Sequence, residues 1–191
     1  NVSFTIVPRI NAAGRLGLSE KSVSLLLTED YEDADEISSQ LCCDNSERQE
    51  IERDILEKID EIIRRKPSLV NDKIIVVDGE NWHQGVIGLI AAKDKQDYGK
   101  PPIVISKLGD IAKGSGRSVE GFSLCDAVFA CSDLLRHCGG HPMAAGLSLK
   151  SKNIELFRQR INEYALKQEN MPFNAWKIAC RFNQALISGP L

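Results

Sequence analysis

Apolar residues recur every three or four positions through a long, otherwise charged stretch from Tyr31 to about Arg65. That spacing places them on one side of a helix and predicts one or two long helices that end before Pro67. The apolar stripe needs another part of the molecule to lie against. It comprises Ile37, Leu41, Ile51, Ile55, Ile59 and Ile62 or Ile63. A shorter helix, capped by Ser19 and ending at Leu27, precedes it.

Beyond Pro67, short β-branched runs alternate with helical patterns. A predicted strand at residues 73–78 is followed by a helix at 85–96 and a second strand at 103–106. Strand, helix and strand with short connections indicate a βαβ unit, whose strands pair in parallel. Further helices are predicted at 123–137 and 153–167, with a strand at 144–149 between them. We therefore expect an α/β fold with a mixed, partly parallel sheet flanked by helices and preceded by a long connector helix.

The pattern changes after Met171. Residues 176–182 are predicted to form a strand without an obvious partner, and the sequence SGP at 188–190 is typical of a turn. No apolar run approaches the roughly 18 residues of a membrane span, and no signal peptide opens the chain. The 191 residues suffice for one core with an appended element. We expect a soluble, cytoplasmic protein that does not contact membranes.

Charge is divided unevenly along the chain. Residues 29–61 hold 14 of the 27 acidic residues and three of the 24 basic ones, a net charge of −11, so the remainder carries +8 against the overall −3. A basic groove is thus compatible with an acidic protein, and the acidic segment is most simply a solvated helix face. A second interpretation is that it repels nucleic acid from the wrong surface.

Six cysteines raise the alternatives of disulfides, a zinc site or buried thiols. Two are adjacent, two lie in an apolar helical pattern, and no Cys-x-x-Cys occurs. Cys138, beside His137 and His141, is the remaining candidate for a zinc ligand. We expect buried thiols and no metal ligands in this chain.

Three glycines surround His141 in the segment GGHPMAAG, residues 139–146. Glycine lacks a Cβ and accepts positive φ, so a backbone rich in glycine can come close to a bound group. Successive N–H groups in such a loop can bind phosphate oxygens, and His141 can add a donor or a positive charge. A plain Gly-Gly turn is the structural alternative.

Three other segments carry comparable chemistry: PRINAAGRLG at 8–17, WHQGVIG at 82–88 and KGSGRS at 113–118. The guanidinium of Arg117 can bind a phosphate with two parallel hydrogen bonds. Ser115 and Ser118 also raise nucleophilic catalysis with His83 or His141, but the Gly-x-Ser-x-Gly turn typical of such serines is missing.

In this order the four segments resemble RecJ, the bacterial exonucleases specific for single-stranded DNA within the DHH phosphoesterase superfamily. The resemblance runs from Arg9 to Phe157 and includes the sequence NSERQ at 45–49. Gly-Gly-His alone would indicate only the DHH-associated domain, which small phosphodiesterases share. The arginine-rich opening and the Trp-His-x-Gly-Val-Ile-Gly segment point to RecJ.

The resemblance implies Mn²⁺ or Mg²⁺ held by aspartates and histidines of an N-terminal DHH domain, and no Asp-His-His occurs here. The chain opens at Asn1, so we expect a piece of a longer protein that binds no cofactor and cannot cut DNA alone. The expected parts are a junction segment at 1–18, connector helices at 19–67, a DHH-associated α/β domain at 68–170, and the start or remnant of a β domain at 171–191.

The function implied by the resemblance is that of a hydrolase that degrades single-stranded DNA from 5′ to 3′ in DNA repair and recombination. This chain would hold the substrate. Its implied partners are single-stranded DNA, the N-terminal DHH domain, and a single-strand-binding protein or a helicase. The alternatives are a phosphodiesterase for oligonucleotides or cyclic dinucleotides, and a noncatalytic nucleic-acid-binding or scaffold module.

The resemblance also implies site residues. His141 is expected to act on the substrate phosphate and to stabilise the transition state. The expected substrate-binding residues are Arg9, Asn11, Arg15, Arg48, Gln49, Trp82, His83, Ser115, Gly116, Arg117, Ser118, Gly139 and Gly140. Structural alternatives remain, because an arginine at a domain junction can pair with a carboxylate. Similarly, Trp82 can pack in a core instead of stacking on a base.

Overall fold

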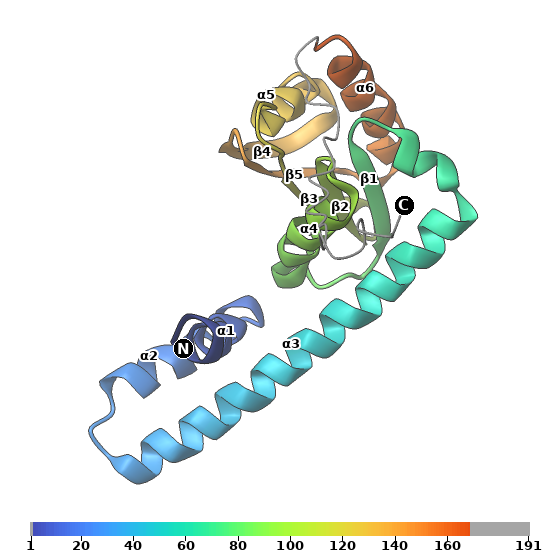
Figure 1. Cartoon of the computed structure of the whole chain (residues 1–191). Coiled ribbons are helices and arrows are strands. Elements are labelled where there is room, and N and C mark those ends of the chain that lie inside the picture. Colours follow the sequence, from blue (N-terminus) through green and yellow to red (C-terminus); the bar gives the residue numbers. More distant parts are fainter. Residues whose placement is uncertain (1, 169–191) are drawn as a thin grey trace, which may run out of the picture.

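A helical arm and a five-stranded sheet domain make up the chain in a computed structural model that describes residues 2–168. The arm contains α1 (Val2–Arg15), α2 (Ser19–Leu27) and α3 (Tyr31–Arg65). In Figure 1, α3 runs from the α1–α2 pair at one end to the sheet domain at the other. The strand predicted at 176–182 and the turn at 188–190 lie outside the described residues.

Helix α3 has clear signals at both ends. The Asp30 side chain caps it by accepting hydrogen bonds from the backbone N–H groups of Glu32 at 2.8 Å and Asp33 at 3.1 Å. Pro67 follows its last turn and begins a short 3₁₀ segment, Pro67–Asn71. The prediction of a long helix before the sheet is confirmed.

The apolar stripe of α3 has two different partners. Leu41 is buried in the half of α3 that packs beside α1, whereas Ile55 and Ile59 are buried against the sheet domain. Both halves of the helix are therefore held by tertiary packing, which stabilises most helices in proteins.

The sheet has the order β1-β2-β3-β5-β4. Strands β1 and β2 are parallel and are joined by α4 (Gln84–Tyr98), and the other neighbouring strands are antiparallel. The predicted βαβ unit and the mixed sheet are confirmed. The strands are β1 (Ile75–Glu80), β2 (Pro102–Leu108), β3 (Ile111–Arg117), β4 (Leu135–His141) and β5 (Ala144–Lys150).

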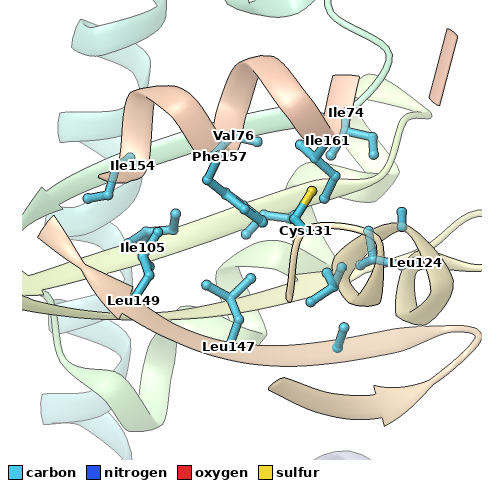
Figure 2. Packing of buried hydrophobic residues seen from close by; sticks show 14 of the residues in the cluster. Ile74, Val76, Ile105, Leu124, Cys131, Leu147, Leu149, Ile154, Phe157 and Ile161 are labelled. Carbon is cyan, nitrogen blue, oxygen red and sulfur yellow. The ribbon is translucent and has the colours of Figure 1, made fainter. Parts of the chain in front are cut away.

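One face of the sheet is covered by α5 (Leu124–Phe129) and α6 (Ile154–Leu166). Figure 2 shows Phe157 and Ile161 of α6 pointing toward the strands, in one cluster with Ile105 and Leu149. These side chains are fully buried, and each contributes roughly 1.5–3 kcal/mol to folding by leaving water. Two 3₁₀ turns, Ser132–Leu134 and Ser151–Asn153, complete this layer.

The opposite face is covered only in part. Helix α4 packs on β2 and β3, and with α3 it buries Ile75, Val77 and Val104. The rest of this face, which we call the open face, consists of side chains from β3, β5 and β4 that are exposed or half-buried. Its residues are Lys113, Ser115, Arg117, His137, Gly139, His141, Ala144, Gly146 and Ser148.

The helix predicted at 123–137 is wrong in its second half. Helix α5 ends at Phe129, and the chain continues as edge strand β4 from Leu135. Pairing of Cys138 with Leu147 of β5 directs the Cys138 side chain toward the core formed with α5 and α6. This long-range pairing overrides a local pattern that also suited a helix.

The glycine-rich segment 113–118 belongs mostly to strand β3, which the sequence did not predict. A Cβ on Gly116 would lie 2.7 Å from Cδ2 of Leu124, and one on Gly114 would lie 3.1 Å from Cγ1 of Ile105. These glycines therefore allow close packing beneath the sheet. They do not make the segment a flexible loop.

The cysteines of the described residues range from buried through half-buried, at Cys125 and Cys138, to exposed. Cys131 is fully buried, and this burial raises its pKa to about 11. Cys42 and Cys43 are exposed, so the prediction of buried thiols is wrong for this pair. No helix in residues 2–168 is long and apolar enough to cross a membrane.

Iodoacetamide at about pH 8 is expected to alkylate Cys42 and Cys43 rapidly in the folded protein and to leave Cys131 unmodified. A raised pKa and burial both keep the Cys131 thiol from reacting, since only an accessible thiolate attacks the reagent. Mass spectrometry of the digested protein measures the extent of alkylation at each cysteine, with a urea-unfolded sample as the control. Equal modification of Cys131 and Cys42 before unfolding would contradict the packing described here.

Candidate phosphate-binding site

Three arginines from distant parts of the sequence come together between the arm and the sheet domain. Arg15 ends α1, Arg48 lies in the middle of α3, and Arg117 ends β3. The pKa of Arg15 is lowered, first by burial and then by the positive charges of Arg48 and Arg117, while Glu52 acts in the opposite direction. We call these residues the arginine cluster. Cations that repel one another favour a bound anion between them.

The end of α1 abuts the start of α4. Nη1 of Arg15 donates a hydrogen bond to the carbonyl oxygen of Gly85 at 3.3 Å. A Cβ on Gly85 would lie 2.0 Å from the carbonyl oxygen of Arg15, so only glycine permits this approach. His83 caps α4, with its Nδ1 accepting a hydrogen bond from the Gly85 N–H at 3.2 Å. The remaining N–H groups of the first turn add partial positive charge beside Arg15.

The Arg117 side chain lies across α4 at Gly88. A Cβ on Gly88 would lie 3.2 Å from Nη2 of Arg117 and 3.1 Å from Oγ of Ser115. Nη1 of Arg117 donates to the Gly116 carbonyl oxygen at 2.9 Å and to Oγ of Ser115 at 3.3 Å. Arg117 forms no ion pair within residues 2–168. Its charge is therefore available to an outside anion.

Arg48 is the member of the cluster with a carboxylate partner. Its Nη1 lies 2.5 Å from an Oε of Glu52, one turn along α3, and its Nη2 donates to Oδ1 of Asn45 at 3.3 Å. The pair holds the Arg48 guanidinium in place. One carboxylate beside three guanidinium groups leaves the site with a net positive charge.

The strand register extends the site across the open face. Arg117 pairs with Ala144, which pairs with His141, so these three side chains share one row on the same side of the sheet. With neighbouring strands about 4.8 Å apart, Arg117 and His141 start about 10 Å from each other. Small residues separate them, so a ligand can approach the sheet backbone between the two side chains.

His141 ends strand β4 and is exposed. Its Nδ1 accepts a hydrogen bond from the Met143 N–H at 3.3 Å, so in the neutral ring Nε2 carries the proton and is directed away from the turn. Gly140 has φ of +152°, and a Cβ there would lie 2.2 Å from the Ala144 carbonyl oxygen. The sequence prediction of a Gly-Gly-His loop is wrong, because residues 139–141 pair with β5 as a strand.

Several predicted site residues have structural roles instead. Trp82 is 4% exposed in the core under α4, which favours the packing alternative over base stacking. Ser118 is fully buried, and its Oγ donates to the Phe122 carbonyl oxygen at 2.6 Å. His83 caps α4, and Gly116 is buried under Leu124. None of these four presents a free side chain to the arginine cluster.

The predicted residues of the arm lie farther along α1 and α3. Arg9 is half-buried, and its Nε donates to Sγ of Cys42 at 3.2 Å, which ties α1 to α3. Asn11 is exposed on α1. Gln49 is exposed and lines a groove of about 370 Å³ beside Arg48.

Sequence reasoning missed Arg53 and Lys93, which line that groove from α3 and α4. The helical spacing of Arg53 from Gln49 would have pointed to it, since residues four apart share a helix face. Nothing in the local sequence marks Lys93, because its position depends on the packing of α4 beside α3.

The described residues do not fit a Mn²⁺ or Mg²⁺ site. Both ions prefer several oxygen ligands, chiefly carboxylates. Within residues 2–168, no group of three or more histidine, cysteine, aspartate or glutamate side chains lies close enough to hold an ion.

Comparisons with a family model, with known proteins and with solved structures agree with one another. The DHHA1 domain model matches residues 71–167. The chain is 37% identical over 166 residues to the single-stranded-DNA-specific exonuclease RecJ of Bacillus subtilis, covering 86% of this chain and 21% of that protein. It is 36% identical over 171 residues to the Salmonella typhimurium exonuclease of the same name, covering 85% and 30%.

A solved structure agrees in fold. The crystal structure of RecJ in complex with Mn²⁺ from Thermus thermophilus superposes with a TM-score of 0.79 and 32% sequence identity, covering 88% of this chain and 25% of that one. The chain thus spans less than a third of the length of each of these relatives.

Proposed function

Because the chain belongs to the DHHA1 domain family and matches RecJ exonucleases over most of its length, we propose that it holds single-stranded DNA by its phosphates for a RecJ-type exonuclease. The observation that carries this proposal is the convergence of Arg15, Arg48 and Arg117. A cluster that keeps three guanidinium groups together with one carboxylate needs an anion to balance its charge. Phosphate is the anion that a RecJ-type substrate offers.

In this proposal Arg117 binds one phosphate with its forked guanidinium, and Arg15 and Arg48 neutralise the charge around it. His141 donates from Nε2 to a phosphate oxygen on the other side of the same row. Ser115, Gly139 and Gly140 flank this row, with Arg9, Asn11 and Gln49 along the arm. Such contacts read no bases, so binding should not depend on DNA sequence.

Hydrolysis is assigned to groups outside the described residues. A bound divalent ion would activate water and neutralise charge on the reacting phosphate. We place that ion in another part of a RecJ-type protein, and we expect this chain alone to bind DNA without cutting it. The proposed setting is 5′ to 3′ degradation during DNA repair and recombination in the cytoplasm, with a single-strand-binding protein or a helicase as partner.

The arm offers a surface for that other part. Phe4 is 81% exposed, Leu27 75% and Tyr31 84%, on α1, α2 and the start of α3. Large apolar side chains left exposed on one part of a molecule are typical of interaction surfaces. We propose that the DHH domain of a RecJ-type protein docks here and closes the site opposite the open face.

The direct test is binding of a fluorescent single-stranded oligonucleotide at several salt concentrations. For about three neutralised phosphates the slope of log K against log salt is near −2, which means a loss of roughly 16-fold between 50 and 200 mM salt. A duplex of equal length and a second base sequence are the controls. An affinity that does not change with salt concentration, or that depends strongly on base sequence, would contradict the proposal.

His141→Ala is expected to weaken binding of a trinucleotide severalfold while leaving the thermal unfolding midpoint almost unchanged. The side chain is exposed and makes one local hydrogen bond, so its removal costs little stability. Lys58→Ala is the control, since Lys58 is exposed on α3 and lies outside the open face. A large fall in the unfolding midpoint would make His141 a structural residue.

A further inference from the structure

A second cavity lies at the end of the sheet opposite the Arg117 row. Its volume is about 470 Å³, and it forms where β3 begins, β5 ends and β4 begins. We call it the distal cavity. It is lined by Asp110, Ile111, Arg136, Lys150 and Lys152. Three of these residues are cations and one is an anion, so the cavity has an excess of positive charge.

The cations of the distal cavity are not neutralised by neighbours. Within residues 2–168, none of Arg136, Lys150 and Lys152 forms an ion pair. By contrast, Lys107 at the end of β2 is neutralised, since it lies 3.2 Å from a carboxylate oxygen of Asp78. The distal cavity thus gathers three unpaired cations at one end of the sheet.

Hydrogen bonds fix the walls of the distal cavity. The Ser151 side chain donates to the Gly109 carbonyl oxygen at 2.5 Å, and its backbone N–H donates to the Asp110 carbonyl oxygen at 2.9 Å. These bonds join the β2–β3 turn to the end of β5, where Lys150 pairs with Ile111. The cavity is therefore formed before any ligand arrives, which lowers the entropy cost of binding.

The open face connects the two sites. Between the Arg117 row and Lys150, the register places Lys113, Ser148 and His137 in one row of polar side chains. Six residue steps along β3 lead from Ile111 to Arg117, a distance of about 20 Å along the strand. At an axial rise of roughly 3.4 Å per nucleotide, as in one strand of duplex DNA, this distance accommodates at most about six nucleotides, and fewer for an extended strand.

We propose that the distal cavity binds a backbone phosphate of the same single strand whose end is held at Arg117, several nucleotides away. This inference rests on the proposed function, since it takes the strand to start at the arginine cluster. The cations bind the phosphate, and Ile111, which is 37% exposed, offers an apolar contact to the adjoining sugar or base. Oligonucleotides long enough to span the open face therefore bind more tightly than short ones.

The test compares a trinucleotide with a 12-nucleotide strand on the Lys150→Gln/Lys152→Gln double variant. The longer strand is expected to lose about tenfold in affinity, and its salt slope should fall by about 0.7, which corresponds to one lost phosphate contact. Trinucleotide binding should be unchanged. Lys58→Gln/Lys167→Gln removes the same charge elsewhere, because Lys58 is exposed on α3 and Lys167 is exposed after α6. This control should retain both affinities.

Two results would overturn the inference. If the double variant binds the 12-nucleotide strand as tightly as the unaltered chain, the distal cavity does not contact DNA, even where Arg117→Gln weakens both probes. If the double variant loses affinity for both probes equally, the lysines act through general charge and not at a distal position. Failure of the proposed function looks different: Arg117→Gln would then leave both probes unaffected.

Discussion

Arg117→Gln is expected to weaken single-stranded DNA binding by about 10- to 100-fold and to reduce the salt slope by about 0.7, the loss of one phosphate contact. A charge-assisted hydrogen bond contributes about 1.5–3 kcal/mol, which converts to this range of affinity. Arg117 has no carboxylate partner in the described part of the chain, so its charge is not already neutralised within the protein.

The loss should be smaller than the full value of the contact. Removing Arg117 also removes a positive charge that lowers the pKa of Arg15, so the variant is relieved of the repulsion between Arg117 and Arg15 before binding. The affinity of Arg117→Lys for DNA should lie between those of the unaltered chain and of Arg117→Gln, because lysine keeps the charge but loses the forked geometry.

Fluorescence anisotropy with a trinucleotide and a longer strand measures the effect. Arg160→Gln is the matched control, since Arg160 pairs with Asp133 at the surface and is outside the site. The thermal unfolding midpoint should stay the same in both variants. An unchanged affinity and slope in Arg117→Gln would remove Arg117 from the proposed site.

Gly85→Ala is expected to destabilise the protein by about 1–3 kcal/mol and to weaken DNA binding at the same time. The new Cβ would lie 2.0 Å from the carbonyl oxygen of Arg15, which is backbone and cannot rotate away. Helix α1 must therefore shift from the start of α4. That shift moves the Arg15 guanidinium and breaks its 3.3 Å hydrogen bond to the Gly85 carbonyl oxygen.

Gly14→Ala is the control for this change. It makes the same substitution one residue before Arg15, where a Cβ would meet no atom within 4 Å. Because alanine favours a helix over glycine by about 1 kcal/mol, this variant should be as stable as the original chain or more so. Urea unfolding and oligonucleotide binding measure both variants. Equal stability of the two would show that the contact between α1 and α4 is not close in solution.

The elements with strong local signals were predictable from the sequence. The stripe of α3 has period 3.6 over 35 residues, and Asp30 and Pro67 mark its ends. Strand β1, helix α4 and strand β2 also follow from local pattern. Strand β3 was missed because Gly114 and Gly116 weaken strand propensity, and the reason for them is the packing of Leu124 and Ile105 underneath.

The site was predictable only in part, because it is built by tertiary structure. The resemblance to RecJ pointed to Arg15, Arg48 and Arg117, but no spacing in the sequence says that residues 33 and 69 positions apart meet. For Trp82, by contrast, the local sequence was misleading. Its motif suggested a base-stacking surface, whereas its indole packs in the core beneath α4.

The arm also has a mechanical consequence. Helix α3 is about 52 Å long, and the C-terminal end of α1 contacts the start of α4. Because α3 packs on the sheet domain and α1 packs on both α3 and the start of α4, neither helix can tilt independently of the sheet. A free helix of this length tilted by about 5° would move its far end by about 4.5 Å. Arg48 lies on α3 and Arg15 on α1. The packing of these two helices therefore fixes the distance between the two charges, and DNA of any sequence meets the same spacing.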